Sequence, residues 1–554
     1  MSGFFMPSLI VLYNRAPLPF AQMALQERVE LPILYLENTT NMSNKASNNL
    51  HSLICSMSKA EKRYFKLYSS RHTLGDKNNY SILFDAVDKQ AEYDEEKILN
   101  KFKREAFTNR FSISKRRLYE AVLKSLDAFH SNSSVDEKIR KQLHYAEILF
   151  DRSLYDQCDK ILQSAQKLAS KHQRWNALLQ ISDMEKGLNE KYNYAGPSKI
   201  DPNKIRTKDK AALKGLEEYS SLWSLKSELF NTLYQKGTVR NNVQKKELET
   251  LVVKKLYKFE PEELAPRAKY LYHHIHSAYW FAVGEYAKSC DHLEQNFTLI
   301  KDQHAPFREP ESVYLSVLTN LIYMYHRTGN YDQAIAHLDE LKNMPLALDL
   351  RYSEDLKVRM FTSVNSVQLT LFLLNRDLAR GQKIIPDVEA GLLLYGDKIG
   401  AVRRSSFYYL IAAILFHSGE YSKSLAWVNH LLNEIDIDGS AETHCFAQLL
   451  YMLLHLELGN KDLLPYALRS TQRYLKTRER TYKFETLLLE FIATISRAKN
   501  KDTRRKCYLT LQSGLFKIEN DPYESAAFEH FDLLNWVGKK LIDLERAEIM
   551  DRRA

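Results

Sequence analysis

The side chains that could do chemistry in this 554-residue sequence are few, and they stand apart from one another. The only histidine cluster is His273-His274-Ile275-His276. On a helix, His273 and His276 would share one face and could serve as a pair of metal ligands. A metal site needs several convergent ligands, and no third one follows at a suitable spacing. We therefore favour histidines that pack in the core or line a binding surface.

Two further patterns suggest other chemistry without completing it. Residues 434–439 are similar to the start of a calcium-binding EF-hand loop, but Cys445 stands where a bidentate glutamate is required. The Ser-x-x-Lys strings at Ser56 and Ser112 lack every companion motif of the acyl enzymes that use them. Phosphate-binding and dinucleotide-binding glycine patterns are absent, as is His-Glu-x-x-His. We therefore expect no enzyme activity, no cofactor and no bound metal.

Basic residues are concentrated in two stretches of a chain whose formal net charge is +10. Between residues 101 and 117, seven basic residues stand against one glutamate: Lys101, Lys103, Arg104, Arg110, Lys115, Arg116 and Arg117. Residues 469–506 are also strongly basic. Such patches attract phosphate backbones, so the first stretch is a candidate nucleic-acid patch. We favour the alternative that long solvated helices carry this charge, because no zinc-finger or RNA-binding signature is present. A degenerate helix-turn-helix within residues 80–129 stays open.

The elements that would position these residues are indicated by a short phrase that recurs along the chain. It reads Gly284-Glu285-Tyr286, Gly329-Asn330-Tyr331 and Gly419-Glu420-Tyr421, with weaker copies at Ser153-Leu154-Tyr155 and Gly459-Asn460-Lys461. From 284 to 329 is 45 residues, and from 329 to 419 is 90, or two steps of 45. Self-similarity at a fixed period indicates a stacked-repeat architecture. Such proteins present an extended surface to their partners.

The best copy of the phrase predicts a helix hairpin. Leu318, Leu321 and Tyr325 are spaced three and four apart, so they share one helix face. Gly329 ends that helix, because glycine enters the left-handed conformation without steric cost. In the second helix the small residue Ala334 lies where the two helices approach most closely, and small residues recur at this place in other copies.

This pattern resembles the tetratricopeptide repeat (TPR), and residues 329–335, Gly-Asn-Tyr-Asp-Gln-Ala-Ile, fit that family unaltered. The spacing of roughly 40 to 47 residues exceeds the 34 usual for the family. The copies at Asn375-Arg376-Asp377 and Gly237-Thr238-Val239 keep little more than the spacing. We therefore expect TPR-like repeats over residues 134–520, in about eight or nine hairpins. The resemblance implies a right-handed superhelical solenoid with a concave groove that binds a protein or peptide.

The resemblance also implies which residues face the groove, namely those at fixed positions of each first helix. They are Ser316, Thr319, Tyr323, His326 and Arg327 in the best copy, Tyr409, Phe416 and His417 in the Gly419 copy, and His274 and Phe281 in the Gly284 copy. Aromatic rings and arginine at such places suit the anchoring of a peptide. The alternative is that several of these residues pack against the neighbouring repeat.

The two ends of the chain differ from the repeats. Residues 1–49 lack the positive start and unbroken apolar run of a signal peptide, and we expect a poorly ordered or non-native extension with the true start at or near Met42. Residues 50–130 are expected to form a bundle of three or four short helices that includes a capping box from Ser58 to Glu61. At the other end, Asp521 as N-cap and Pro522 at the first helical position predict a C-terminal capping helix within residues 521–554.

The composition favours an all-α protein of the cytoplasm. Strand signals are scarce, and no apolar window reaches the roughly 20 residues of a membrane span. Five cysteines at wide spacing suit a reducing compartment. Our first hypothesis is a scaffold or adaptor that binds a protein or peptide of unspecified identity, without a membrane partner. The second is a signal-responsive regulator, in which the repeats control the contact of residues 50–130 with DNA or a protein. Its architecture is similar to that of bacterial peptide-sensing regulators. The oligomeric state stays open.

Overall fold

All regular structure in the described part of the chain is helical. The computed structural model describes residues 48–71, 79–130, 134–194, 201–347, 354–433 and 441–553, and these contain helices but no strand. The all-α class expected from the sequence is thereby confirmed. The expectations for residues 1–47, Met42 included, and for the EF-hand-like residues 434–439 lie outside the described residues. Contacts divide the described residues into two compact units: one comprises those between 48 and 170 and between 177 and 202, the other those between 171 and 176 and between 203 and 553.

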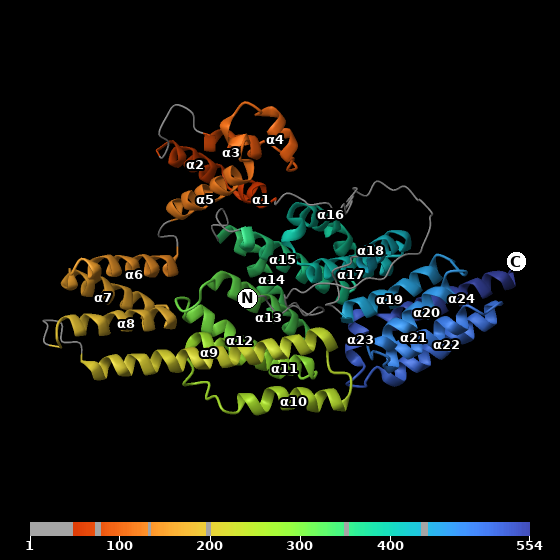
Figure 1. The fold of residues 1–554 in the computed structure, drawn as a ribbon. Helices are drawn as coiled ribbons and strands as arrows, with labels where there is room; N and C mark the ends of the chain where they lie inside the picture. Colours follow the sequence, from red (N-terminus) through yellow and green to blue (C-terminus); the bar gives the residue numbers. More distant parts are fainter. Residues whose placement is uncertain are drawn as a thin grey trace. The chain divides into compact units, whose positions relative to one another are not determined.

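The first unit opens with a bundle of short helices (Figure 1). They are α1 (Asn49–Ser56), α2 (Lys59–Arg71), α3 (Asn79–Asp88), α4 (Glu95–Lys101), the 3-10 helix η1 (Ala106–Thr108) and α5 (Phe111–Phe129). Phe65 and Phe84 stack in its core with ring centroids 4.5 Å apart. The predicted capping box is confirmed: Ser58 N–H donates to Glu61 Oε2 over 2.6 Å, and Glu61 N–H donates to Ser58 Oγ over 3.3 Å. These reciprocal bonds satisfy donors that the start of a helix leaves free.

Three longer helices follow in the chain around a core of their own. They are α6 (Val135–Asp151), α7 (Tyr155–Lys171) and α8 (Trp175–Lys191). Cys158, Leu162 and Ile181 lie in this core and are fully buried. The three helices contribute apolar faces at the spacing expected for amphipathic helices, so each buries one stripe against the other two.

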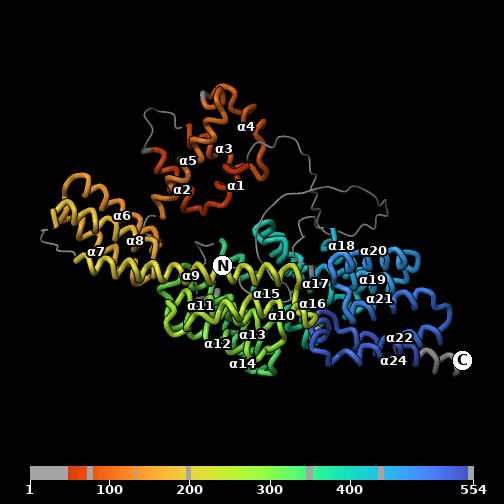
Figure 2. Tube along the Cα trace, turned by 60° about the horizontal axis from the view of Figure 1, so that its bottom comes forward, coloured from red at the N-terminus to blue at the C-terminus, as the bar shows by residue number. Residues whose placement is uncertain are grey.

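The second unit consists of helices that pack against their chain neighbours. They are α9 (Pro202–Lys236), α10 (Asn242–Leu256), α11 (Pro266–Ala282), α12 (Tyr286–Asp302), α13 (Pro310–Arg327), α14 (Tyr331–Ala347), α15 (Glu354–Leu374), α16 (Leu378–Tyr395), η3 (Gly396–Lys398), α17 (Ala401–His417), α18 (Tyr421–Asn433), α19 (Ala441–Glu457), α20 (Leu464–Thr477), α21 (Lys483–Ile495), α22 (Lys501–Ile518), α23 (Ser525–His530) and α24 (Leu533–Arg553). Each of α13, α15, α17 and α19 contacts the helix that follows it and also the helix after that (Figure 1, Figure 2). This is a repeat-like pattern, as the recurring phrase predicts.

The recurring phrase forms the same turn at every copy except the one at Gly237. Positive φ angles between 73° and 83° occur at its glycines, Gly284, Gly329, Gly419 and Gly459. The residue after each glycine donates its N–H to the carbonyl five residues earlier, as Asn330 does to Tyr325 over 2.7 Å. This bond belongs to the Schellman arrangement that closes a helix C-terminus. Ser153 and Arg376 sit at the same place in the weaker copies, with the same bonds and a φ of 58°. The turn therefore persists where the glycine has been lost.

The small residue in the second helix of each hairpin is buried at the closest approach of the two helices. Cys158, Ser289, Ala334 and Ser424 occupy this position, and none is more than 3% exposed. The two serines also bond across the hairpin, as the Ser424 hydroxyl donates to the Ala412 carbonyl over 2.7 Å. A larger side chain here would separate the helices and remove that bond.

The C-terminal region differs from the single capping helix expected to begin at Pro522. Asp521 accepts a hydrogen bond from Tyr523 N–H over 3.0 Å within a short turn, and no helix starts there. The helical residues that follow are divided between α23 and α24. Asp532 causes the division, because its Oδ1 accepts from Asn535 N–H over 3.2 Å and so caps the start of α24.

Helix α24 packs against α22 and covers its apolar side. Trp536 is 4% exposed, and its ring lies 5.8 Å from that of Tyr508. Its indole N–H donates to Glu457 Oε1 over 2.7 Å, so the polar edge of this large side chain is satisfied as well. The covering role predicted for the C-terminal region therefore belongs to α24.

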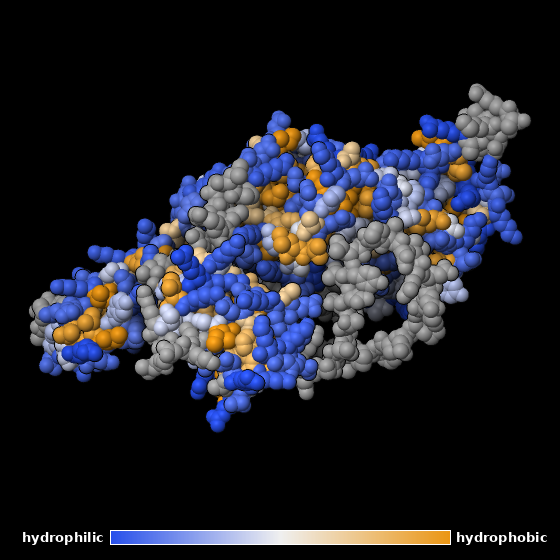
Figure 3. Space-filling view, turned by 90° about the horizontal axis from the view of Figure 1, so that it is seen from above, coloured by the Kyte–Doolittle hydropathy of each residue, from blue (hydrophilic) through white to orange (hydrophobic). Residues whose placement is uncertain are grey.

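Figure 3 shows one face on which hydrophilic residues prevail and hydrophobic residues gather in separate patches. Among the described residues, no helix has both the length and the apolar character that crossing a membrane requires.

Replacing the small residue at a hairpin contact tests this packing. We expect Ser424→Val to lower the free energy of unfolding by about 2–4 kcal/mol, because it overpacks the contact and leaves the Ala412 carbonyl without its partner. Ser422→Val is the matched control, since Ser422 is exposed on the same helix; it should change stability by less than about 0.5 kcal/mol. Denaturant unfolding of the full chain measures both, and equal effects would contradict the assigned contact.

Candidate functional site

The residues predicted to line a groove come from α11, α13 and α17, and most of them are buried. Seven are no more than 7% exposed: His274, Phe281, Ser316, Thr319, Tyr323, Tyr409 and Phe416. The other three, His326, Arg327 and His417, are half-buried. Most of these side chains therefore pack against neighbouring helices in this structure.

Three of the predicted residues meet around one cavity of about 30 Å³. Phe281, Tyr323 and Tyr409 line it from three different helices. The lining is completed by Thr238, Tyr286, Thr370, Leu373, Leu374, Leu410, Glu442, Ala526 and His530. Tyr409 donates its hydroxyl to the carbonyl of His530 over 2.7 Å, which fixes one wall. The cavity is therefore aromatic on one side and carries ionisable groups on another.

Other predicted residues make separate contacts. The His274 ring stacks between Phe230 and Tyr270, with centroid distances of 5.3 and 5.5 Å. Thr319 donates its hydroxyl within its own helix, to Leu315 over 2.6 Å. These residues serve the packing of α11 and α13, and none of them lines the cavity.

The half-buried residues lie at the ends of α13 and α17. The Arg327 guanidinium lies 4.1 Å from the ring centroid of Tyr286, which also lines the cavity. His326 Nε2 is 2.7 Å from Asn375 Oδ1 in the next hairpin. The rings of Phe416 and His417 both approach that of Phe531, each with a centroid distance of 5.1 Å. Ser316, the remaining predicted residue, is buried on α13.

A non-helical segment, residues 237–240, lies beside the cavity. Gly237 has a φ of 72°, and an added Cβ would meet Arg480 Nη2 at 2.4 Å and Glu442 Oε1 at 3.0 Å, so only glycine fits here. Thr238 donates its hydroxyl to Glu442 Oε1 over 3.2 Å. Val239 N–H donates to the carbonyl of Ala282 at the end of α11 over 3.0 Å. The segment thus contacts both α11 and α19.

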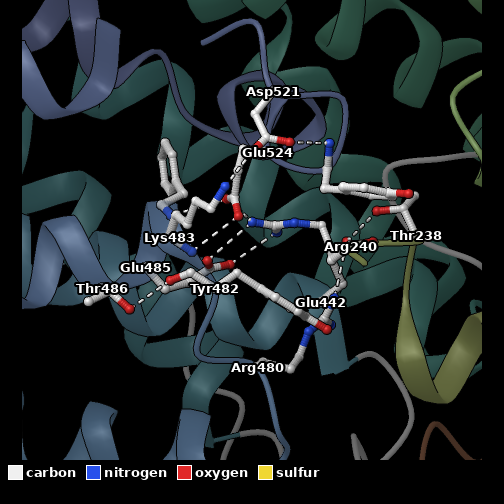
Figure 4. Close-up of polar contacts among 12 residues, drawn as sticks. Thr238, Arg240, Glu442, Arg480, Tyr482, Lys483, Glu485, Thr486, Asp521 and Glu524 are labelled. Carbon is white, nitrogen blue, oxygen red and sulfur yellow. Dashed lines mark hydrogen bonds and ion pairs between the residues drawn. The ribbon is translucent and has the colours of Figure 1, made fainter. Parts of the chain in front are cut away.

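Arg240 ends this segment and is held by two glutamates from distant parts of the chain (Figure 4). Its Nη1 and Nη2 donate to the two carboxylate oxygens of Glu485 over 3.1 and 3.2 Å. Nη2 also donates to Glu524 Oε2 over 2.6 Å. The guanidinium lies 4.4 Å from the ring centroid of Tyr482. All three charged side chains are at most 3% exposed, so this is a buried, bidentate recognition of a guanidinium.

The two glutamates are themselves fixed by the helix that carries one of them. Glu524 accepts from the backbone N–H groups of Lys483 and Phe484, each over 3.1 Å, at the start of α21. Glu485 lies in the first turn of the same helix. Free N–H groups and the helix dipole both favour negative charge at this end. The carboxylates are therefore pre-positioned for a cation.

A second buried pair adjoins the first. Arg480 Nη2 donates to Glu442 Oε1 over 3.2 Å, and His530 Nε2 lies 4.0 Å from Glu442 Oε2. Glu442 belongs to the first turn of α19, while Arg480 precedes α21. We call Arg240, Glu442, Arg480, Glu485 and Glu524 the arginine–glutamate cluster.

Burial and mutual attraction set the charges of this cluster. Burial alone would raise the pKa of Glu442, but Arg480, His530 and Arg240 outweigh it and hold the pKa below its ordinary value. Burial raises the pKa of Glu485, and the nearby Arg240 offsets this only in part. Burial lowers the pKa of His530 to about 4, so this histidine is neutral near pH 7. Since Arg240 and Arg480 both keep their charge, the cluster holds two cations among three carboxyl groups.

Sequence reasoning did not find this cluster. Arg240 lies 245 residues from Glu485 and 284 from Glu524, so no spacing pattern links them. The copy at Gly237-Thr238-Val239 was recognised only as a degenerate repeat. The sequence offers one signal: Arg240 and Glu485 stand next to apolar residues. A charged side chain at such a position is buried only when it is paired.

The histidine cluster has a fourth member, on the next helix, that spacing did not indicate. His273 and His276 of α11 lie beside His292 of α12. The Nδ1 atoms of His273 and His292 are 3.0 Å apart, and the rings of His276 and His292 stack at 4.5 Å with an interplanar angle of 8°. Because parallel rings do not converge their lone pairs, this is a packed group of imidazoles. Among the described residues, no three His, Cys, Asp or Glu side chains are arranged to hold a metal ion.

The candidate nucleic-acid patch lies on the N-terminal bundle of the first unit. Six of its residues are exposed: Lys101, Lys103, Arg104, Arg110, Arg116 and Arg117. Lys115 is half-buried, pairs with Glu95 and lies 5.3 Å from the ring centroid of Phe111. Arg116 pairs with Glu120 over 3.1 Å. Part of this positive charge is therefore neutralised within the bundle.

The contribution of the arginine–glutamate cluster to stability can be measured by removing Arg240. We expect Arg240→Ala to lower the free energy of unfolding by about 3–5 kcal/mol, because two buried carboxylates lose their partner. The control is Lys255→Ala, which removes a pair with Glu228 whose side chains are about half exposed; such pairs are worth about 0–1 kcal/mol. Urea unfolding of the full chain checks both, and comparable losses would contradict the buried recognition described above.

The packed imidazoles predict a loss of stability in mild acid. Burial lowers the pKa of His273 to about 3 and that of His276 to about 4, and it also lowers the pKa of His292. The unfolded chain binds these protons near pH 6.5, so the stabilisation is complete above that pH and is lost as the pH falls toward 4. We expect His276→Phe to reduce the loss between pH 7.5 and 5 by about 1–2 kcal/mol. The control is His144→Gln, which replaces a histidine whose side chain is 68% exposed.

Neither a family model nor a curated protein matches the sequence. What the structure shows is a helical protein whose helices pack against their neighbours in a repeat-like pattern. The site is therefore argued from its own residues: an aromatic cavity, a non-helical segment beside it, and a cluster of glutamates that holds the arginine of that segment.

Proposed function

We propose that this chain is a non-enzymatic scaffold or adaptor that binds a segment of a partner protein along the inner surface of a right-handed, TPR-like superhelix. In this proposal α11, α13, α15, α17, α19 and α21 form the inner surface, and the helices between them form the outer layer. The contacts that join α13, α15, α17 and α19 in sequence support this arrangement. Solenoids of this kind use the inner surface for partners.

The observation that carries the proposal is that the inner helices already hold a short non-helical piece of chain. Residues 237–240 donate backbone and side-chain hydrogen bonds to α11 and α19, and their arginine is held at α21. Aromatic residues of α11, α13 and α17 line the adjoining cavity. A surface with rings, carboxylates and carbonyls directed at one segment has the chemistry that peptide recognition requires.

The regulator hypothesis is the second proposal, and the exposed cations of the bundle support it. Lys103, Arg104, Arg110 and Arg117 are exposed on the N-terminal bundle. If this bundle binds DNA, retention of the full chain on a DNA column should fall steeply as salt rises. Absence of retention at low salt would leave the adaptor as the better proposal.

Variants at the half-buried ends of α13 and α17 test the adaptor proposal. Full-length chain is used to capture a partner from native lysate at moderate salt, and the affinity of that partner is then measured with purified proteins. We expect Arg327→Ala with His417→Ala to weaken binding at least about tenfold, because each removes a half-buried anchor beside the aromatic residues. Arg380→Ala, at a residue whose side chain is 75% exposed on α16, should leave the affinity unchanged. A partner that tolerates the double variant but not Arg380→Ala would place the binding surface on the outer layer.

A further inference from the structure

The connection between α9 and α10 departs from the pattern of the other turns. At Gly284 and Gly329 the next helix begins two residues after the glycine, whereas α10 begins five residues after Gly237. The additional residues are not helical. They include the whole Thr238–Arg240 stretch that contacts α11, α19 and α21.

The contacts of residues 237–240 are those of a bound peptide. One backbone N–H, that of Val239, is donated to a helix-end carbonyl. One hydroxyl, that of Thr238, is donated to a carboxylate. The long side chain of Arg240 enters a site made by two carboxylates and the ring of Tyr482, with all its charge buried. Backbone bonds, a polar contact and one deep anchor are the usual components of peptide recognition.

A segment that only connected two helices would not require a buried arginine between two glutamates. A buried ion pair seldom stabilises a fold more than well-packed apolar residues of the same volume. Nor is the cluster fully satisfied, since Arg240 Nε and Arg480 Nη1 are buried without a hydrogen-bond partner among the described residues. Two fixed carboxylates and an aromatic ring are selective for a guanidinium. This planar cation can donate paired hydrogen bonds to the carboxylates and stack on the ring at the same time.

We propose that residues 237–240 are an internal ligand, and that the partner presents a short segment whose arginine takes the place of Arg240 between Glu485 and Glu524. This inference rests on the proposed function and names the chemistry of the partner. Binding is an exchange: the partner's guanidinium makes the bonds that Arg240 gives up, while Arg240 regains water. The segment then leaves α11 and α19, and the cavity beside Tyr323 opens to the partner's neighbouring side chains.

The exchange has a definite thermodynamic consequence. A tethered segment competes with an effective concentration on the order of millimolar. A free peptide with the same anchor must overcome that competition in the natural chain, and a chain without Arg240 removes it. The same peptide should therefore bind the Arg240→Ala variant far more tightly than the natural chain.

The experiment uses the full chain and a synthetic peptide, acetyl-Gly-Thr-Val-Arg-amide. Its matched control carries citrulline, which keeps the shape of arginine without its charge. Calorimetry and thermal unfolding are measured for the natural chain, for Arg240→Ala, and for Arg240→Ala combined with Glu485→Gln. We expect Arg240→Ala to bind the arginine peptide at least about tenfold more tightly than the citrulline peptide, and to be stabilised by it. The added Glu485→Gln change should abolish this preference.

The outcomes separate the possibilities. Equal binding of both peptides, or no binding by a variant that still unfolds cooperatively, would overturn the proposal and leave the cluster as a mechanical join. If Arg240→Ala does not fold, Arg240→Lys keeps a charge but loses the fork of two N–H groups, and the same preference is expected from it in weaker form. Failure of both variants to bind the arginine peptide overturns the proposal.

Failure of this inference and failure of the proposed function are distinguishable. If Arg327→Ala with His417→Ala weakens the captured partner but the peptides do not discriminate, the inner surface binds a partner through other chemistry. If the captured partner ignores that double variant, the adaptor proposal fails whatever the peptides do. If both experiments succeed, the captured partner should lose affinity when one particular arginine of its own is changed to alanine.

Discussion

Arg240 is the residue on which the arrangement of the second unit most depends. It joins the end of the α9–α10 connection to α21 and to the turn before α23, across 245 and 284 residues of chain. A charge buried this deeply is stable only when its partners are held in place. The partners are held by backbone N–H groups at the start of α21, and Tyr482 closes the side that the carboxylates leave open. Arg240 therefore links hairpins that are distant in sequence.

Many of the other polar groups inside the second unit are uncharged. Its interior histidines, His273, His274 and His530, are neutral because burial lowers the pKa of each well below 7. The serines at hairpin contacts bond to carbonyls of the facing helix. These serines are thus satisfied within one hairpin, whereas the arginine–glutamate cluster joins separate hairpins.

The parts of this structure that depend on local sequence could be predicted, and the parts that depend on distant residues could not. Gly329 and Ala334 indicated a turn and a close contact because both effects arise within one hairpin. The capping box at Ser58 followed from four adjacent residues. The break at Asp532 was missed because an N-cap inside a helical run competes with helix propensity, and packing of α24 decides the outcome. The arginine–glutamate cluster and the role of His292 required knowing which helices become neighbours.

The prediction of groove residues shows the same division. The resemblance to the repeat family assigned Phe281, Tyr323 and Tyr409 to the groove, and these three residues line one cavity in the structure. It could not indicate that another stretch of the chain, residues 237–240, would lie against that surface. That stretch contains no pattern of its own, and its position is set by where α9 ends and by which carboxylates lie within reach of Arg240.

The long reach of Arg240 also changes how the second unit is expected to assemble. An open array of hairpins gains stability one hairpin at a time, and its end can be shortened with a proportionate loss. Here the contact between residues 240 and 524 closes a loop that contains nearly every hairpin of the unit, so the entropy of closing that loop must be overcome before the contact contributes. Deleting the chain from α21 onward would remove Glu485 and Glu524, the partners of Arg240. A buried cation near the beginning of the unit would then be unpaired. The array therefore behaves as one cooperative body, in which Glu485 and Glu524 complete a site whose cation comes from the beginning of the unit.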